Sequence, residues 1–275
     1  MSRRVPALAW VGGGVVAVLA VVAILAPALS PYDPHAAAGP SVSAPSSDHL
    51  LGTNDSGQDI LSQLIWGARS SAVVALLAAA LSVAVGVLVG MAAGLRRGWV
   101  DVVATRVVDA FLAVPALPLL ILIAALAGPS RPTVILVIAL AAWPSIARVL
   151  RSQTLTLGGR GYVEIARGLG AGPLYVIRRH LVPAVAPIIA ANFVYWAGAA
   201  VVLQAGLGVL GLNDPTEVSW GSVLNRALSH PGVYLTSEWT WWVLPVGLVI
   251  TVAALGLALL GLALEPRSNP RLRGA

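Results

Sequence analysis

The sequence predicts an all-α membrane protein with six transmembrane helices, from its composition, its long apolar runs and the placement of its arginines. Hydrophobic residues make up 58% of the 275 residues and charged residues only 10%. A typical soluble domain carries about 25% charged residues. Apolar runs of about 18 residues or more have the length that crosses a bilayer as a helix.

The apolar runs place the helices and divide the chain. We expect them at about residues 7–29, 70–95, 107–127, 133–150, 184–212 and 239–264. The first run follows two arginines, as in a signal peptide, but it is too long for a signal peptide's centre, so we expect it to be retained. Residues 1–69 then form the first helix and an external segment, 70–265 the transmembrane core with a polar loop at 160–183, and 266–275 a cytoplasmic tail.

Arginine sets the expected orientation. All 17 basic residues are arginine, and only Arg69, Arg131 and Arg226 lie outside if the N-terminus is placed inside. Cytoplasmic loops of membrane proteins are enriched in basic residues, so both termini and the loop at 160–183 are expected in the cytoplasm. The same enrichment accounts for the net charge of +6 without a nucleic-acid partner.

Two residue types that the sequence lacks exclude several chemistries. Without cysteine the chain forms neither a disulfide framework nor a thiolate metal site. Without lysine it cannot supply a Walker A phosphate loop. Any ATP chemistry is therefore expected in another subunit.

The external segment is rich in turn formers and acids. His49, Asp55 and Asp59 raise the question of a metal site, but their spacing matches no known site, and solvated turn chemistry is the better interpretation. We therefore expect no metal here. Residues 59–67 are typical of a short amphipathic helix with Asp59 in its first turn.

Small residues and prolines mark the second and third helices. Gly86, Gly90 and Gly94 form overlapping GxxxG patterns, which let helix backbones approach closely in lipid. Pro115 and Pro118 predict a kink in the third helix.

Polar residues near the third and fifth helices have two interpretations each. Asp109 is an ionisable residue near the membrane, but so close to the helix end we expect it to pair with Arg106 or another cytoplasmic arginine. Asn192 and Gln204 are candidates for the substrate path; hydrogen bonding between helices is the equal alternative.

Glycine and tryptophan mark the ends of the last two helices. Three glycines between residues 206 and 211 suggest a broken or re-entrant end to the fifth helix. The tryptophans at 239, 241 and 242 predict an interfacial aromatic belt at the start of the sixth.

The loop at 160–183 carries a spaced motif. Glu164-Ile-Ala166 opens it, Gly170 follows, and His180-Leu-Val-Pro183 closes it. This pattern resembles the EAA loop of permease subunits of ABC importers, although Ile165, His180 and Val182 depart from the family residues. The Arg-His before the closing residues is similar to the dipeptide, oligopeptide and nickel branch.

Further segments resemble the second permease subunit of that branch, in order along the chain. They are LGTNDSGQD at 51–59, LIWGAR at 64–69, GWVD at 98–101, RVVD at 106–109, SWGSVL at 219–224 and LEPR at 264–267. The resemblance therefore covers most of the chain and implies the type I ABC importer permease fold, in a bacterial inner membrane.

The resemblance also implies a mechanism and partners. A short helix in the loop, the coupling helix, would dock on an ATPase subunit through Glu164, Ala166, Arg167, Gly170 and Pro183. We expect Gly170 in the left-handed conformation that ends this helix and Pro173 at the start of the next. The complex would hold a homologous second permease, two ATPases that bind ATP and Mg²⁺, and an external substrate-binding protein.

The substrate and the rival classes remain to be named. Peptides are the expected substrate, with nickel, glutathione or a haem-like ligand as alternatives on the same machinery. An enzyme is disfavoured because the chain has no HExxH or GxSxG motif, so we expect no catalytic residues. A secondary transporter is disfavoured because the predicted helix centres lack ionisable residues.

Overall fold

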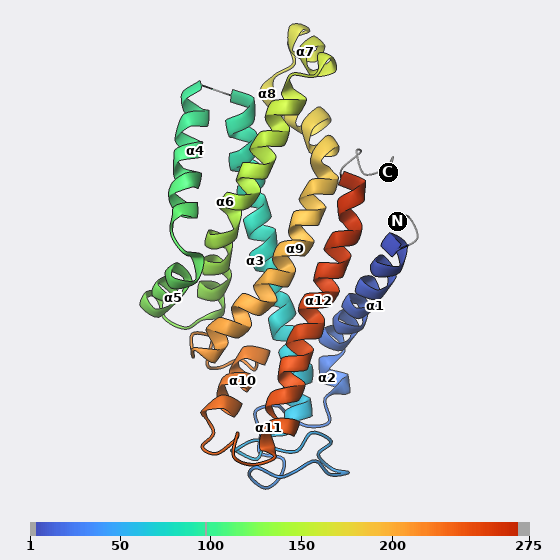
Figure 1. The fold of residues 1–275 in the computed structure, drawn as a ribbon, viewed down its shortest axis with the longest axis vertical. Coiled ribbons are helices and arrows are strands. Elements are labelled where there is room, and N and C mark those ends of the chain that lie inside the picture. Colours follow the sequence, from blue (N-terminus) through green and yellow to red (C-terminus); the bar gives the residue numbers. More distant parts are fainter. Residues whose placement is uncertain (1–3, 97, 269–275) are drawn as a thin grey trace.

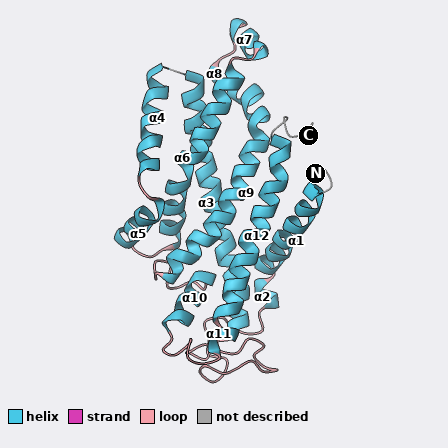
Figure 2. Ribbon diagram, in the orientation of Figure 1, coloured by secondary structure: helices cyan, strands magenta, loops and turns pink. Residues whose placement is uncertain are grey.

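The computed structural model describes residues 4–96 and 98–268, and within these ranges the fold is a bundle of helices (Figures 1 and 2). Apart from one isolated β-bridge between Thr53 and Asp59, the regular structure of the described residues is helical. The expectation of an all-α protein is confirmed.

The helices follow the chain in this order: α1 (Arg4–Ile24), α2 (Ala26–Leu29), α3 (Ile60–Arg96), α4 (Gly98–Ala113), α5 (Ala116–Ala127), α6 (Arg131–Gly158), α7 (Gly161–Gly168), α8 (Pro173–Val176), a π-helical turn (Ile177–Leu181), α9 (Val182–Val209), α10 (Trp220–Ser229), α11 (Glu238–Trp241) and α12 (Val243–Ser268).

Length and apolarity identify the helices that can cross a membrane. Four described helical segments qualify by themselves: Ile60–Arg96, Arg131–Gly158, Pro173–Val209 and Glu238–Leu264. The bent pair α4 and α5 raises the number to five. The apolar part of α1, Leu8–Ile24, is shorter than the roughly 20 residues of a typical crossing. The count of six therefore stays a prediction.

The glycine pattern of α3 packs against α6. A Cβ added at Gly86 would lie 2.6 Å from the Ile146 side chain, and one at Gly90 would lie 2.5 Å from the Ala147 carbonyl oxygen. No side chain fits at such distances, so glycine is what lets the two backbones approach. The predicted close packing of this helix is confirmed.

Two predicted boundaries were wrong. The short helix expected at 59–67 and the span expected at 70–95 form one continuous helix, α3, about 55 Å long. The third span is bent by 89° between α4 and α5, which is far more than a kink. Pro115 begins α5 as its N-cap, since its fixed φ of −58° suits a helix start and its ring cannot continue α4.

The end of the fifth helix was also predicted wrongly. Helix α9 continues through Gly206 and Gly208, and the left-handed backbone comes only at Gly211, with φ at 74°. A Cβ at Gly208 would lie 2.7 Å from the backbone of Gly221, so this glycine serves helix packing. It does not mark a re-entrant loop.

The prediction of an interfacial aromatic belt was wrong for two of the three tryptophans. Trp242 is fully buried and Trp241 nearly so, and their rings stack on each other. Only Trp239 is exposed. The pair packs in the protein core because the loops before α3 close over it: a Cβ at Gly52 would touch the Trp241 ring.

The bundle has two different polar ends. Helix α7 projects at one end, and the start of α1 and the end of α12 lie toward the same end (Figure 1). The long loop between α2 and α3, with α10 and α11, covers the opposite end. We call these the α7 end and the loop end.

Candidate functional site

The α7 end carries the spaced motif as a short helix held between two turns. Helix α6 stops at Gly158, and α7 begins after Arg160, which takes extended backbone angles at the N-cap. Glu164 lies in the first turn of α7 and Arg167 in the last. Each charge complements the helix dipole at its own end.

Gly170 ends α7 in a Schellman motif. Its φ is 89°, and its N–H donates to the Arg167 carbonyl at 2.9 Å. The N–H of Ala171 donates to the Ala166 carbonyl at 3.0 Å, which is the second bond of that motif. Pro173 then begins α8. The predicted conformations of Gly170 and Pro173 are both confirmed.

One side chain anchors α7 to the bundle. Val163 is fully buried and packs in a cluster with Val176 and Leu181, which also holds Ile146 and Leu150 from α6. This anchor fixes the place of α7, while the rest of the helix stays outside the core.

The outer face of α7 is both charged and apolar. Glu164 and Arg167 are exposed, and neither has an ion-pair partner among the described residues. Ile165 is 66% exposed and Leu169 is 84% exposed. Large apolar side chains that face solvent beside charges are typical of a surface that binds another protein.

Pro183 lies just beyond a π-helical turn. The N–H of Val182 donates to the carbonyl of Ile177, five residues back, in place of the usual four. An α-helix would drive the Pro183 ring into the Arg179 carbonyl, and the wider turn relieves this clash. The motif proline therefore sets the geometry where the loop rejoins α9.

An aromatic cluster beside α7 has no local signature in the sequence. The ring of His180 lies 5.7 Å from the rings of both Tyr162 and Tyr175. Tyr162 belongs to α7 and His180 to the π-helical turn, so the cluster ties the helix to the start of α9. Only the fold brings these separated residues together.

The structure separates the two residues predicted for the substrate path. Asn192 donates a hydrogen bond of 2.9 Å to the Ile188 carbonyl of its own helix. Gln204 is 3% exposed and lines a small hollow of about 10 Å³ near the loop end, where its Oε1 has no hydrogen-bond partner. Neither the predicted path nor the alternative of bonding between helices is established by these contacts.

The two acidic residues near α6 form ion pairs. Arg148 Nη2 lies 2.7 Å from Asp109 Oδ1, and Arg151 holds both carboxylate oxygens of Asp101. The expected pairing of Asp109 is thus with Arg148 and not with Arg106. These two bonds fasten α4 to α6.

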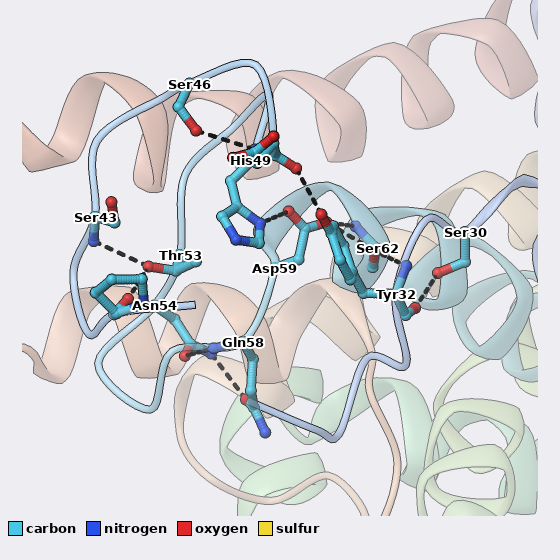
Figure 3. A network of polar contacts seen from close by, with 12 residues as sticks. Ser30, Tyr32, Ser43, Ser46, His49, Thr53, Asn54, Gln58, Asp59 and Ser62 are labelled. Carbon is cyan, nitrogen blue, oxygen red and sulfur yellow. Dashed lines mark hydrogen bonds and ion pairs between the residues drawn. The ribbon is translucent and has the colours of Figure 1, made fainter. Parts of the chain in front are cut away.

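The loop end is closed by a buried polar network (Figure 3). His49 Nδ1 lies 3.0 Å from Asp59 Oδ1, and the other oxygen of Asp59 accepts hydrogen bonds from the N–H and hydroxyl of Ser62. Asp59 is 1% exposed and His49 is 6% exposed. The expectation of solvated turn chemistry was wrong for His49 and Asp59, because the loop folds back over the start of α3, whereas Asp55 is exposed as expected.

The carboxylate of Asp59 therefore has two roles that its sequence neighbours do not reveal. It caps α3 through Ser62, the third residue of the helix, and it pairs with His49. Within the described ranges no group of three His, Cys, Asp or Glu residues has the spacing to hold a metal ion.

Comparisons with known proteins agree with this architecture. Residues 86–274 match the family model described as binding-protein-dependent transport system inner membrane component. Residues 7–50 match the N-terminal TM domain of oligopeptide transport permease C.

Relatives match over most of the chain. A provisionally named peptide transport system permease protein of Brucella suis biovar 1 is 35% identical over 267 residues, which cover 94% of this chain and 87% of that protein. A provisionally named peptide permease protein of the same organism is 33% identical over 231 residues, covering 83% and 75%. The glutathione transport system permease protein GsiD of Escherichia coli O1:K1 is 31% identical over 268 residues, covering 94% and 85%. This chain belongs to the family of binding-protein-dependent transport system inner membrane components.

Proposed function

We propose that this chain is one permease subunit of an ATP-driven ABC importer of peptides and that it forms half of the translocation path. The second half would come from a homologous permease. Two ATPase subunits would bind ATP and Mg²⁺, and an external binding protein would deliver the substrate. The chain itself would hydrolyse nothing.

The observation that carries this proposal is the exposed helix α7. It presents Glu164 and Arg167 beside the exposed apolar residues Ile165 and Leu169. Val163 packs against residues of α6 and α9, and the left-handed backbone of Gly170 fixes the end of α7. A partner that displaces α7 would therefore also displace α6 and α9. Ala166 and Pro183 complete the proposed coupling surface.

The arginine pattern supports the orientation that coupling requires. Fourteen of the 17 arginines belong to the segments expected in the cytoplasm, and α7 is among them. ATP is hydrolysed in the cytoplasm, so the proposed docking face and the proposed ATPases lie on the same side of the bacterial inner membrane, as do both chain termini.

The substrate class follows from the relatives. Their names specify peptides and glutathione, and glutathione is itself a tripeptide. We therefore place peptides first. ATP binding would close the ATPases, move α7 and switch the path between outward and inward access, as a two-state element biased by nucleotide.

Reconstitution tests the proposal. The chain is inserted into proteoliposomes with its second permease, the ATPases and the binding protein, and uptake of labelled tri-alanine is measured. We expect uptake that requires ATP and stops when the ATPases or the binding protein are left out. Uptake driven by a proton gradient without ATPases would instead identify a secondary transporter.

A further inference from the structure

The loop end contains a cleft of about 430 Å³. Its polar lining comes from four segments far apart in the sequence: the loop between α2 and α3 gives His35, α3 gives Arg69 and Ser70, α6 gives Arg131, and the loop before α10 gives Thr216 and Glu217. Trp66 adds an aromatic wall. The fold, and not a local motif, assembles this cleft.

Two of the arginines at and beside the cleft are paired with acidic residues. Arg131 forms an ion pair with Glu217, and the Ser70 hydroxyl donates to the same carboxylate at 3.1 Å. Arg226, which lines an adjoining cleft of about 220 Å³, pairs with Asp55 at 2.7 Å.

Arg69 is left without an acidic partner in the portion of the chain that the structure describes. Its guanidinium lies 5.8 Å from the centre of the Trp66 ring, a cation–π distance that holds it at the cleft. The cleft therefore presents one uncompensated positive charge on a fixed aromatic support.

Unpartnered acceptors lie beside the cleft. Gln204 Oε1 and Asn213 Oδ1 are buried without hydrogen-bond partners, and both residues line the 10 Å³ hollow that shares Ser70, Arg131 and Glu217 with the cleft. The hollow has room for one water molecule or one ammonium group. An N–H donor of a ligand would satisfy these oxygens.

We propose that this cleft binds the carboxylate-bearing end of a peptide substrate, with Arg69 as the group that binds the carboxylate and Trp66 as the wall beside it. The planar guanidinium binds a carboxylate through two parallel hydrogen bonds. The inference rests on the proposed function, and it assigns part of substrate selection to the permease as well as to the binding protein.

The experiment compares two peptides in the reconstituted complex: tri-alanine and tri-alanine amide, which lacks the carboxylate. Each is tested with the unchanged chain, with Arg69→Gln and with Arg69→Lys. The same binding protein is used throughout, so its own preference cancels when variants are compared. Co-purification with the second permease and ATPases checks assembly.

We expect Arg69→Gln to raise the apparent KM for tri-alanine about tenfold, since a hydrogen bond to a charged group is typically worth that factor. Uptake of the amide should stay within about twofold of the unchanged complex. Arg69→Lys keeps a positive charge but not the planar guanidinium. Its apparent KM for tri-alanine should therefore lie between that of the unchanged chain and that of Arg69→Gln.

Four results would overturn the inference. Equal losses for both peptides, or a loss of ATPase stimulation by the loaded binding protein, would assign Arg69 to structure or to docking. Unchanged uptake of both peptides in Arg69→Gln would show that the carboxylate is bound elsewhere. If the unchanged complex takes up neither peptide with ATP, the proposed function itself fails, and this inference fails with it.

Discussion

The α7 end and the loop end are both polar segments between apolar helices, yet the protein uses them in opposite ways. At the loop end, charged and polar side chains are buried in pairs, such as His49 with Asp59. At the α7 end, Glu164 and Arg167 face solvent without ion-pair partners among the described residues. The charged pair His49–Asp59 is thus buried at the loop end, whereas the two charges of α7 are exposed to solvent.

The difference follows from what each end can bury. The loop between α2 and α3 is long enough to fold back on α3, and its polar groups satisfy one another away from water. The loop between α6 and α8 holds one eight-residue helix, and Val163 is the buried hydrophobic residue of that helix. The loop end therefore has a buried polar network, and partner binding is proposed for the α7 end.

The strongest test of this contrast removes a buried charge at the loop end. Asp59→Ala should lower the free energy of unfolding by about 3 kcal/mol, because it leaves His49 buried without its partner and removes the cap of α3. The measurement is the unfolding transition in detergent.

The matched control is Asp48→Ala. Asp48 belongs to the same loop, but its side chain is exposed, so the change should cost less than about 0.5 kcal/mol. A similar decrease in the free energy of unfolding in both variants would show that the buried pair of Asp59 and His49 adds no more stability than an exposed side chain.

The next test concerns the left-handed conformation of Gly170, which ends α7. Gly170→Val forces a β-branched residue to a φ of 89°, which costs about 1–2 kcal/mol and should displace the helix. We expect ATP-dependent uptake to fall at least tenfold, the factor that corresponds to about 1.4 kcal/mol, while membrane insertion is retained. Uptake in proteoliposomes and the amount of inserted protein are measured together.

Gly172→Val is the control for this change, because Gly172 has a φ of −67° and a ψ of 161°, which valine adopts readily. It should transport nearly as well as the unchanged chain. Full uptake by Gly170→Val would show that the left-handed conformation at residue 170 is not needed to couple the ATPases to transport.

A charge reversal tests the open surface directly. Glu164→Arg should weaken co-purification of the ATPase subunits about five- to tenfold, by placing a wrong charge on the proposed docking face. Asp48→Arg makes the same change at an exposed site of the loop end and should leave co-purification unchanged. Equal retention of the ATPases in both variants would contradict the assignment of α7.

The smallest effect is expected from a surface hydrogen bond at the loop end. The hydroxyl of Thr216, and then its N–H, bond to the Asp214 carboxylate and lower the pKa of Asp214 from its usual value. A carboxyl group whose pKa is lowered by folding adds stability above its unfolded-state pKa and loses it as the pH falls through the folded-state pKa.

Thr216→Ala should therefore cost less than about 1 kcal/mol at neutral pH and nothing once Asp214 is protonated. Thr216→Ser keeps the hydroxyl and should keep the pH dependence. The measurement is the free energy of unfolding of each variant from neutral to acidic pH. If Thr216→Ala lowers that free energy equally at all pH values, the hydrogen bond to Asp214 is not the cause.

Local rules succeeded where one residue type decides the backbone. Gly170 took the predicted left-handed conformation because glycine has no Cβ to clash there, and Pro173 began α8 because its ring fixes φ near the helical value. The same rules failed for Gly208, whose glycine is required by contact with Gly221, a partner in another helix.

The sequence by itself determined the class of this protein: its apolar runs and arginine distribution specify a membrane protein of several helices, and the spacing of Glu164, Gly170 and Pro183 resembles the EAA loop of ABC importer permeases. The tertiary structure alone decided which polar residues are buried and which are open. It closed the loop end over Asp59 and Trp242, and it gathered Trp66, Arg69 and Glu217 around one cleft. Burial and charge pairing depend on residues far apart in the chain, and no local pattern specifies them.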